Sequence, residues 1–296
     1  MKIKLDCIPC KQRQILECLR MNNQNEKLQE KILRKVIDVL ANADWTSTSV
    51  QLTTKIHKIV REETGIQDPY KEVKEKYNEI ILNLYTRVKE IINKSPDPLN
   101  TAIRMAIAGN IIDFGPKREH DINIEKTIKD VLNKDFTIDD YQLLKERIKE
   151  ANNLLFFADN SGEIVFDKIL IETIIEVRKN MGIKRDLKIT VIVKGGPILN
   201  DATLDDVKFI GMDKIPNIEF KMTSNGTSNT GPSLDSGEVK TWIKEHDVTI
   251  AKGMGNYESL SEFNNLFFLL ITKCNVVASD LGVNKGDFIL KYNKRK

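Results

Sequence analysis

The chain has 296 residues, of which 41% are hydrophobic and 30% are charged, so fibrous and disordered classes are excluded and a substantial core is expected. Its 46 lysines and arginines nearly balance 43 aspartates and glutamates, which leaves a net charge of +3 and no basic stripe of the kind that nucleic-acid binding needs. No apolar run approaches the roughly 18 residues of a membrane span, so we expect neither nucleic acid nor a membrane as a partner.

The N-terminal segment, residues 1–6, lacks the apolar stretch of a signal peptide. Three of the four cysteines, Cys7, Cys10 and Cys18, lie close together and Cys274 is far away, unlike the dense pattern of a secreted disulfide-rich domain. We therefore expect a cytoplasmic protein with reduced thiols, and its oligomeric state stays open.

Helical periodicity dominates the first half of the chain. Apolar residues recur at spacings of three and four over residues 27–40 and again over residues 70–92. Further helices are expected over residues 47–63, 99–109, 124–132 and 138–151. No strand is expected before residue 152, so we predict an all-helical domain over residues 1–151.

The second half alternates between short apolar runs and longer amphipathic segments. The apolar runs predict buried strands over residues 154–158, 189–193, 248–251, 266–271, 276–278 and 288–290. A helix is expected over residues 164–179, between the first two strands, and a strand–helix–strand unit implies a largely parallel sheet. We therefore predict an α/β domain over residues 152–296.

The first polar motif, ADNSGEIVFD at residues 158–167, directly follows a predicted strand. Ligands of open α/β sheets bind beyond the carboxyl ends of the strands, and the N–H groups of the following turn and helix favour an anion there. Asp159 and Asn160 offer hard oxygen ligands, which suit Mg²⁺ or Mn²⁺. The alternative interpretation is that one of them only caps the helix.

The second motif, VKGGPILNDAT at residues 193–203, repeats this arrangement after the next strand. Lys194 is placed to meet a phosphate as a point charge, and Asp201 to complete a ligand set with Asp159 and Asn160. A turn with a helix cap is again the alternative. Two such motifs on neighbouring strands would converge in space, which favours a shared site.

The third motif, AKGMGNYE at residues 251–258, adds Lys252 and Asn256 beside glycines that allow the backbone to approach a ligand closely. Glycine turns are common, so this motif alone indicates little. As a third strand end with polar groups, it favours one binding site at this edge of the sheet.

Together these motifs resemble the damage-control phosphatase family, also known as domain of unknown function eighty-nine and as acidic-residue methyltransferase-like proteins. DCIPC at residues 6–10 and RMAIAGNIIDFG at residues 104–115 resemble its stand-alone microbial branch, which carries an N-terminal CxxC. The resemblance spans nearly the whole chain. It implies an N-terminal helical domain followed by an α/β/α sandwich, a divalent metal, and hydrolysis of phosphomonoesters of small metabolites, such as sugar phosphates or damaged and overflow metabolites.

Carried over by motif, the resemblance assigns catalysis and metal binding to Asp159, Asn160 and Asp201. It also implies contacts with the substrate or its phosphate for five side chains: Glu163, Lys194, Lys252, Asn256 and Asn110. Mg²⁺, Mn²⁺, Co²⁺ and Ni²⁺ are all candidate cofactors, because oxygen-rich sites accept several ions. Asn110 alternatively only ends the helix that precedes it.

The expected chemistry is metal-assisted attack of water on the phosphoryl group. A divalent cation polarises this group and lowers the pKa of the attacking water, while lysines neutralise the developing charge. An aspartyl-phosphate intermediate at Asp159 stays open, although a metal-ligating carboxylate is a poorer nucleophile than a free one.

Two other functions stay open. A carboxyl methyltransferase that uses S-adenosylmethionine needs a glycine-rich first loop and an acidic residue for the ribose, whereas the Asp-Asn pair of this loop suits a metal better. A non-enzymatic module that binds nucleotides or protein partners would need no metal.

The cysteines and histidines are interpreted mainly as structural or surface residues. One CxxC pair falls short of the four ligands that zinc usually takes, so we interpret Cys7 and Cys10 mainly as structural thiols near the site. A metal or redox role, with Cys18 as a third ligand, is the alternative. All three histidines, His57, His120 and His246, are expected at the surface.

Overall fold

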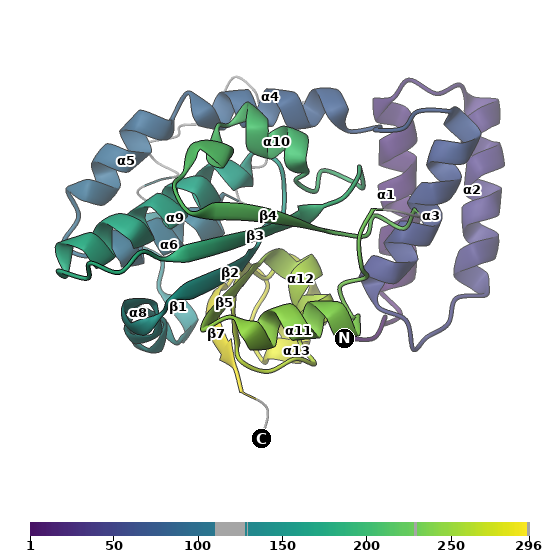
Figure 1. Cartoon of the computed structure of the whole chain (residues 1–296). Helices are drawn as coiled ribbons and strands as arrows, with labels where there is room; N and C mark the ends of the chain where they lie inside the picture. The colour runs from purple at the N-terminus through teal and green to yellow at the C-terminus, as the bar shows by residue number, and fades with distance from the viewer. Residues whose placement is uncertain (110–127, 129, 228–229, 295–296) are drawn as a thin grey trace.

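The computed structural model describes residues 1–109, 128, 130–227 and 230–294 (Figure 1). Three helices stand side by side at one end of the molecule: α1 (Cys7–Met21), α2 (Glu26–Ala41) and α3 (Ser49–Thr64). Their apolar faces form a hydrophobic cluster of their own, centred on Ile15, Ile32 and Ile56. This three-helix unit therefore packs around a core that is separate from the core of the sheet.

A seven-stranded sheet forms the centre of the rest of the chain. Its strands are β1 (Phe136–Asp139), β2 (Asn153–Phe157), β3 (Lys188–Lys194), β4 (Ile218–Thr223), β5 (Val248–Lys252), β6 (Leu266–Ile271) and β7 (Phe288–Asn293). The strand order is β1-β7-β6-β5-β2-β3-β4, and every neighbouring pair is parallel except β6 and β7. The predicted α/β class with a largely parallel sheet is confirmed.

Helices cover both faces of this sheet. On β2, Leu154 and Phe156 belong to one hydrophobic cluster and Leu155 and Phe157 to the other, as expected for a strand buried on both sides. The first cluster includes α4 (Lys71–Leu82), α5 (Tyr85–Asn93), α6 (Pro98–Ala108), α8 (Tyr141–Glu150), α9 (Glu163–Asn180) and α10 (Leu204–Phe209), which precedes a short 3-10 helix (Met212–Lys214). The second includes α11 (Gly237–Glu245), α12 (Gly253–Leu260) and α13 (Asn275–Leu281).

The hydrophobic cores group the elements differently from the predicted division at residue 151. Helices α4 to α6 precede that position, yet they share a core with the sheet and not with the three-helix unit. The division into residues 1–151 and 152–296 stays a prediction. No helix within the described ranges is long and apolar enough to cross a membrane.

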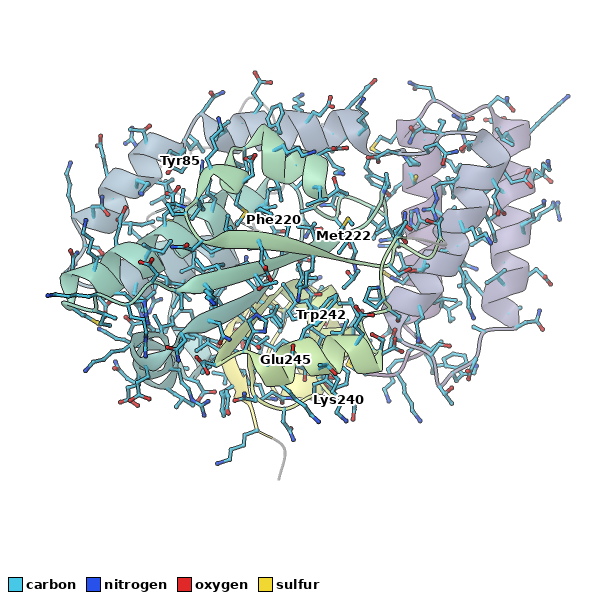
Figure 2. The ribbon with its side chains drawn as sticks, viewed as in Figure 1. Tyr85, Phe220, Met222, Lys240, Trp242 and Glu245 are labelled. Carbon is cyan, nitrogen blue, oxygen red and sulfur yellow. The ribbon has the colours of Figure 1, made fainter. Side chains whose placement is uncertain are left out.

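Three secondary-structure predictions are wrong. Strands β1 and β4 were missed, because both lie at the edges of the sheet and carry polar residues; on β4, Met222 is exposed and Phe220 is half-buried (Figure 2). Residues 276–278 belong to helix α13 and not to a strand. The Cys274 side chain caps the first turn of α13, and the helix ends at Gly282 in the left-handed conformation, so the apolar run is one helical turn.

The helix expected over residues 124–132 lies mostly outside the described residues.

The prediction of a surface histidine is wrong for His57. Its side chain is only 2% exposed, because residue 57 lies on the buried side of α3 with Ile56 and Val60. Burial, reinforced by the positive charges of Lys11 and Arg61, lowers the pKa of His57 to about 3. His246 is half-buried and hydrogen-bonded, and His120 lies outside the described residues.

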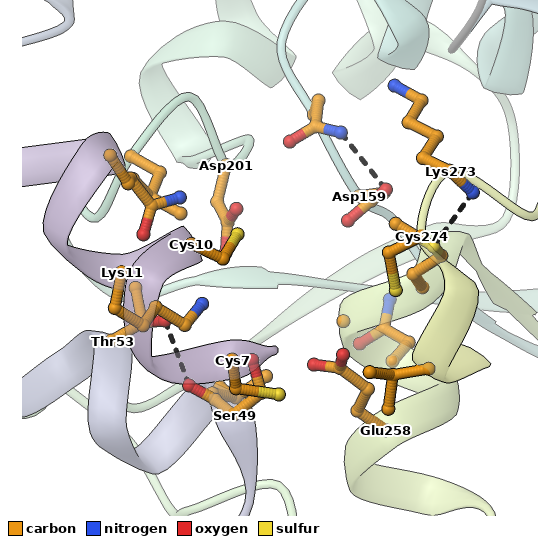
Figure 3. Close-up of a pocket in the computed structure, with 18 of the residues that line it drawn as sticks. Cys7, Cys10, Lys11, Ser49, Thr53, Asp159, Asp201, Glu258, Lys273 and Cys274 are labelled. Atoms are coloured by element: carbon orange, nitrogen blue, oxygen red, sulfur yellow. Dashed lines mark hydrogen bonds between the residues drawn. The ribbon is translucent and has the colours of Figure 1, made fainter. Parts of the chain in front are cut away.

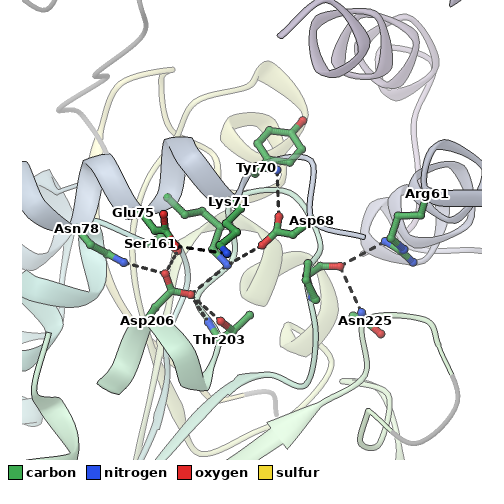
Figure 4. Close-up of polar contacts among 12 residues, drawn as sticks. Arg61, Asp68, Tyr70, Lys71, Glu75, Asn78, Ser161, Thr203, Asp206 and Asn225 are labelled. Carbon is green, nitrogen blue, oxygen red and sulfur yellow. Dashed lines mark hydrogen bonds and ion pairs between the residues drawn. The ribbon is translucent and has the colours of Figure 1, made fainter. Parts of the chain in front are cut away.

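A buried polar network ties α4 to the loops at the carboxyl edge of the sheet (Figure 4). Asp206, at the start of α10, accepts hydrogen bonds from Asn78 at 2.8 Å, Ser161 at 2.9 Å and Thr203 at 2.7 Å, and it pairs with Lys74 at 3.1 Å. Although burial opposes the shift, Lys74 and the hydrogen bonds from Thr203 hold the pKa of Asp206 below its ordinary value. One carboxylate therefore connects a helix of the first half with the loops after β2 and β3.

Replacing Asp206 with Asn should lower the free energy of unfolding by about 3 kcal/mol, because the buried Lys74 ammonium loses the nearer of its two charged partners and keeps only Asp68, at 3.5 Å. Urea denaturation at pH 7 measures this loss. Asp205→Asn is the matched control, since Asp205 lies in the same helical turn but is exposed, and it should change stability by less than about 0.5 kcal/mol. Equal effects of the two substitutions would contradict the role of the network.

His57 should make the protein less stable in acid. Below pH 6.5 the unfolded chain binds a proton at His57 that the folded chain binds only near pH 3, so the free energy of unfolding falls as the pH decreases through this window. At pH 5 this contribution is about 2 kcal/mol. His57→Gln should remove it, so that urea denaturation at pH 8 and pH 5 gives a smaller difference than in the wild type. An unchanged difference would count against a buried neutral His57.

Candidate active site

The loops that follow β2 and β3 pair with each other at the carboxyl edge of the sheet. Asn160 and Asp201 form an isolated antiparallel bridge, and the N–H of Ala202 donates to the carbonyl of Asp159 at 2.8 Å. Short backbone hydrogen bonds of this kind hold the two loops in one register. Consequently the three residues predicted as metal ligands lie together, although 41 positions separate Asn160 from Asp201 in the chain.

These three side chains line a cavity of about 750 Å³. One wall consists of the strand-end loops and α12, and the opposite wall consists of α1 and the start of α3 (Figure 3). Cys7, Cys10 and Lys11 from α1 thus face Asp159 and Asp201 across the cavity. The site lies between the three-helix unit and the sheet.

Asn160 links the carboxylates of this cluster. Its Nδ2 donates to Asp159 Oδ2 at 3.0 Å and to Glu163 Oε1 at 2.8 Å. Because both N–H groups of the amide are used, the oxygen Oδ1 is the atom with which Asn160 can bind a cation. Glu163 Oε2 is buried and has no hydrogen-bond partner among the described residues.

The carboxylates of Asp159, Glu163 and Asp201 carry more negative charge than the nearby positive groups neutralise. Burial and the neighbouring carboxylate of Asp159 raise the pKa of Glu163 to about 8. Burial also raises the pKa of Asp201 to about 7, although Lys194, 3.8 Å away, opposes the shift. Raised pKa values of this kind mark carboxylates that lack sufficient positive charge nearby.

The donor set fits a hard divalent cation. Two carboxylates and an amide oxygen are ligands that Mg²⁺ and Mn²⁺ accept, and Mg²⁺ often binds through one or two carboxylates, completing its coordination with water and substrate phosphate. Within the described part of the chain, no group of three or more His, Cys, Asp or Glu side chains is arranged to hold a metal ion. A cation here would therefore depend on the Asn160 amide and on ligands from outside the protein.

Glycine at position 253 is required by the position of Asp159. Gly253 has φ +77°, and a Cβ atom there would lie 1.8 Å from Oδ2 of Asp159. The Asp159 carboxylate therefore lies directly against the backbone at the start of α12. Any side chain at residue 253 would displace it.

The N–H groups of the turn after β2 do not serve as a free anion site, contrary to expectation. The N–H of Ser161 donates to the carbonyl of Asn200 at 2.8 Å, and the N–H of Gly162 donates to Asn78 Oδ1 at 2.6 Å. These donors fix the turn in place, so the N–H groups of Ser161 and Gly162 are not available to a ligand.

The predicted phosphate-binding residues differ in their positions. Lys194 lines the cavity beside Asp201, in agreement with its predicted role. Lys252 is only 1% exposed and pairs with Asp167 at 2.6 Å, and it does not line the cavity. A direct contact between Lys252 and phosphate is therefore not supported. Burial alone would lower the pKa of Lys252, but the negative charges of Asp167 and Glu163 raise it. Lys252 therefore carries a buried positive charge behind the site.

Glu163 and Asn256 are placed to position other groups. Glu163 lies behind Asn160 and outside the cavity lining. Asn256 lines the cavity, but its Nδ2 donates to the carbonyls of Ala158 and Lys252 at 3.0 and 2.7 Å, which joins the ends of β2 and β5. Asn110 lies outside the described residues.

The helix before Asn110 does end beside the site. A Cβ atom on Gly109 would lie 2.8 Å from the ring of Phe166 and 3.5 Å from Cα of Glu163. The end of α6 therefore contacts the first turns of α9, immediately behind the motif that carries Asp159.

All four cysteines are free thiols. Cys7, Cys10 and Cys274 line the cavity, whereas Cys18 is 1% exposed within the core of the three-helix unit. This separation does not support Cys18 as a third ligand beside the CxxC pair. The placement agrees with the interpretation of Cys7 and Cys10 as thiols near the site.

Two charged residues near the site were not assigned a role from the sequence. Asp167 lies four positions after Glu163 on α9 and holds Lys252, and its Oδ2 is buried without a partner among the described residues. Lys11 lines the cavity from α1. Its signal in the sequence is a lysine on an otherwise apolar helical stripe.

Gly253→Ala should displace the carboxylate of Asp159, the predicted metal ligand, and thereby weaken Mn²⁺ binding by at least about 10-fold. Isothermal titration calorimetry with MnCl₂ measures the affinity. Gly237→Ala is the matched control, because a Cβ atom there meets no other atom within 4 Å. If Gly253→Ala binds Mn²⁺ as tightly as the control, Asp159 is not the ligand we assign.

Comparison with known proteins places the chain in a family. A model of the damage-control phosphatase ARMT1-like domain matches residues 3–289. A damage-control phosphatase from Archaeoglobus fulgidus is 34% identical, over 98% of this chain and 99% of that protein. The damage-control phosphatase PH1575 from Pyrococcus horikoshii is 33% identical over the full length of both chains.

The fold agrees with this relationship. A crystal structure of the Pyrococcus horikoshii protein, described as a DUF89 family protein, superimposes with a TM-score of 0.82 at 32% identity and covers 99% of this chain and 100% of that chain. The resemblance expected from the motifs, and with it the predicted phosphatase class, is confirmed. The chain belongs to the damage-control phosphatase family with an ARMT1-like domain.

Proposed function

We propose that this protein hydrolyses phosphomonoesters of small metabolites with the help of a divalent cation held by Asp159, Asn160 and Asp201. One observation carries the proposal: the pairing of the loops after β2 and β3 brings these three oxygen donors together on the wall of a cavity. The candidate cations are Mg²⁺, Mn²⁺, Co²⁺ and Ni²⁺. Such an ion supplies Lewis acidity at the phosphoryl group.

Other residues of the site neutralise charge or orient the cation ligands. Lys194 lies at the cavity wall beside Asp201, where its ammonium group can neutralise charge on a phosphoryl oxygen. Asn160 orients Asp159 and is itself held by Glu163. Buried Lys252, held by Asp167, acts against the negative charge of Glu163.

The substrate class follows from the lining of the cavity. Side chains with hydroxyl and amide groups, Ser49, Thr53, Asn200 and Asn275, line it together with the charged groups. Such groups suit the hydroxyls of a sugar phosphate or a related polar metabolite, and the volume is within the usual range for small-molecule sites. The cytoplasmic location and the absence of a nucleic-acid partner stay predictions.

A phosphate-release screen tests the proposal. The purified protein is incubated with sugar phosphates and cofactor phosphates in Mg²⁺, Mn²⁺, Co²⁺ or Ni²⁺, and with EDTA in place of the cation. We expect turnover that EDTA abolishes. Asp159→Asn should lower the rate by at least about 100-fold, because the contribution of a Lewis acid is several kcal/mol.

The control variant is Asp205→Asn, which removes an exposed carboxylate near the same sheet edge and should retain the wild-type rate. No turnover with any cation would defeat the proposal. So would turnover that persists in EDTA and in Asp159→Asn.

A further inference from the structure

Lys11 occupies an unusual position on α1. The buried residues of this helix are Cys7, Lys11, Ile15, Cys18 and Leu19, which form one stripe at helical spacing. Lys11 is the charged member of this apolar stripe and is only 8% exposed. A lysine on the core side of a helix is rare unless its charge is paired.

Lys11 has no hydrogen bond or ion pair among the described residues, whereas buried Lys74 and Lys252 each have a carboxylate within 3.1 Å. The side chain extends from α1 into the cavity, towards the space between Asp201 and Glu258 (Figure 3). The charge of Lys11 interacts with the carboxylates of Glu258 and Asp201, but neither of them forms an ion pair or a hydrogen bond with it. Leaving a buried ammonium group without such a direct partner is costly, so its presence at a cavity wall favours an anionic ligand.

A second polar atom on the same helix is also unsatisfied. Oε1 of Gln14 is buried and finds no hydrogen-bond partner in the part of the chain that the structure describes, and Gln14 lines the same cavity one helical turn after Lys11. Two polar groups on one helical face therefore point to a ligand that carries both negative charge and a hydrogen-bond donor. A phosphomonoester of a hydroxylated metabolite has both.

The charges of the proposed site require a further cation. A divalent cation is neutralised by the carboxylates of Asp159 and Asp201, so a phosphate dianion must be balanced by other groups. Lys194 contributes one positive charge from the sheet side. Arg13, Lys273 and Lys285 also line the cavity, but they are exposed to solvent, whereas Lys11 contributes a buried positive charge from the opposite wall.

We propose that Lys11 binds the phosphoryl group of the substrate, so that this group lies between the cation ligands on the sheet edge and the three-helix unit. This inference rests on the proposed function. It assigns to α1, the helix of the CxxC motif, a direct part in substrate binding. Gln14 then accepts a hydrogen bond from the remainder of the substrate.

The test measures binding of inorganic phosphate to the Mn²⁺-loaded protein by isothermal titration calorimetry. Lys11→Met keeps the apolar stem of the side chain and removes its charge, and we expect phosphate to bind roughly 10- to 100-fold more weakly. Mn²⁺ affinity should stay within twofold of the wild type. Lys11→Arg should restore most of the phosphate affinity.

Arg20→Met is the matched control, because Arg20 is an exposed cation in the last turn of the same helix and does not line the cavity. It should bind phosphate as the wild type does. Circular dichroism identifies any variant that fails to fold, in which case Lys11→Gln takes the place of Lys11→Met.

Unchanged phosphate affinity in folded Lys11→Met or Lys11→Gln would overturn the inference. A parallel loss of Mn²⁺ affinity would also overturn it, since Lys11 would then act on the cation site as a whole. Neither result bears on the proposed phosphatase activity, which is tested separately by phosphate release from an ester by the wild type. Failure of the wild type itself to release phosphate with any cation would count against the proposed function instead.

Discussion

The proposed active site depends on holding two like-charged carboxylates close together in a partly buried place. Asp159 and Asp201 belong to different loops and repel each other, and burial makes this repulsion stronger. The backbone bridge between Asn160 and Asp201 opposes the repulsion, and Asp206 anchors both loops to α4. The polar network and the close contact at Gly253 thus serve one purpose, which is to keep these oxygens converged.

Positive charge is arranged around this cluster in two ways. Lys252 lies behind it and is enclosed with Asp167, so it contributes a fixed charge that solvent cannot reach. Lys194 and Lys11 lie at the cavity walls, where a ligand can contact them. A site that must accept a dianion benefits from this division, because the buried charge stabilises the carboxylates without competing for the substrate.

The sequence predicted the parts of the structure that have strong local signals. Buried strands such as β2 and β6 are continuous apolar runs, and the motifs after β2 and β3 converge because carboxyl ends of parallel strands meet at one edge. Edge strands β1 and β4 have no such run, and residues 276–278 fit either a strand or one helical turn. The burial of Lys252 could not be predicted, because its partner Asp167 is 85 positions away, a contact that spacing does not reveal. Lys11 was passed over for a similar reason, since only the packing of α1 shows which side of the helix faces the cavity.

The cavity has one wall from the three-helix unit and one from the sheet with its covering helices, and the hydrophobic clusters of these two parts are separate. The oxygens that define the chemistry belong to the sheet, whereas Lys11, Gln14 and the thiols belong to the three-helix unit. Substitutions on the outer wall can therefore alter which metabolite is accepted while the hydrolytic apparatus keeps its geometry. An architecture of this kind lets one reaction diversify over many small compounds, with selectivity and reactivity free to evolve separately.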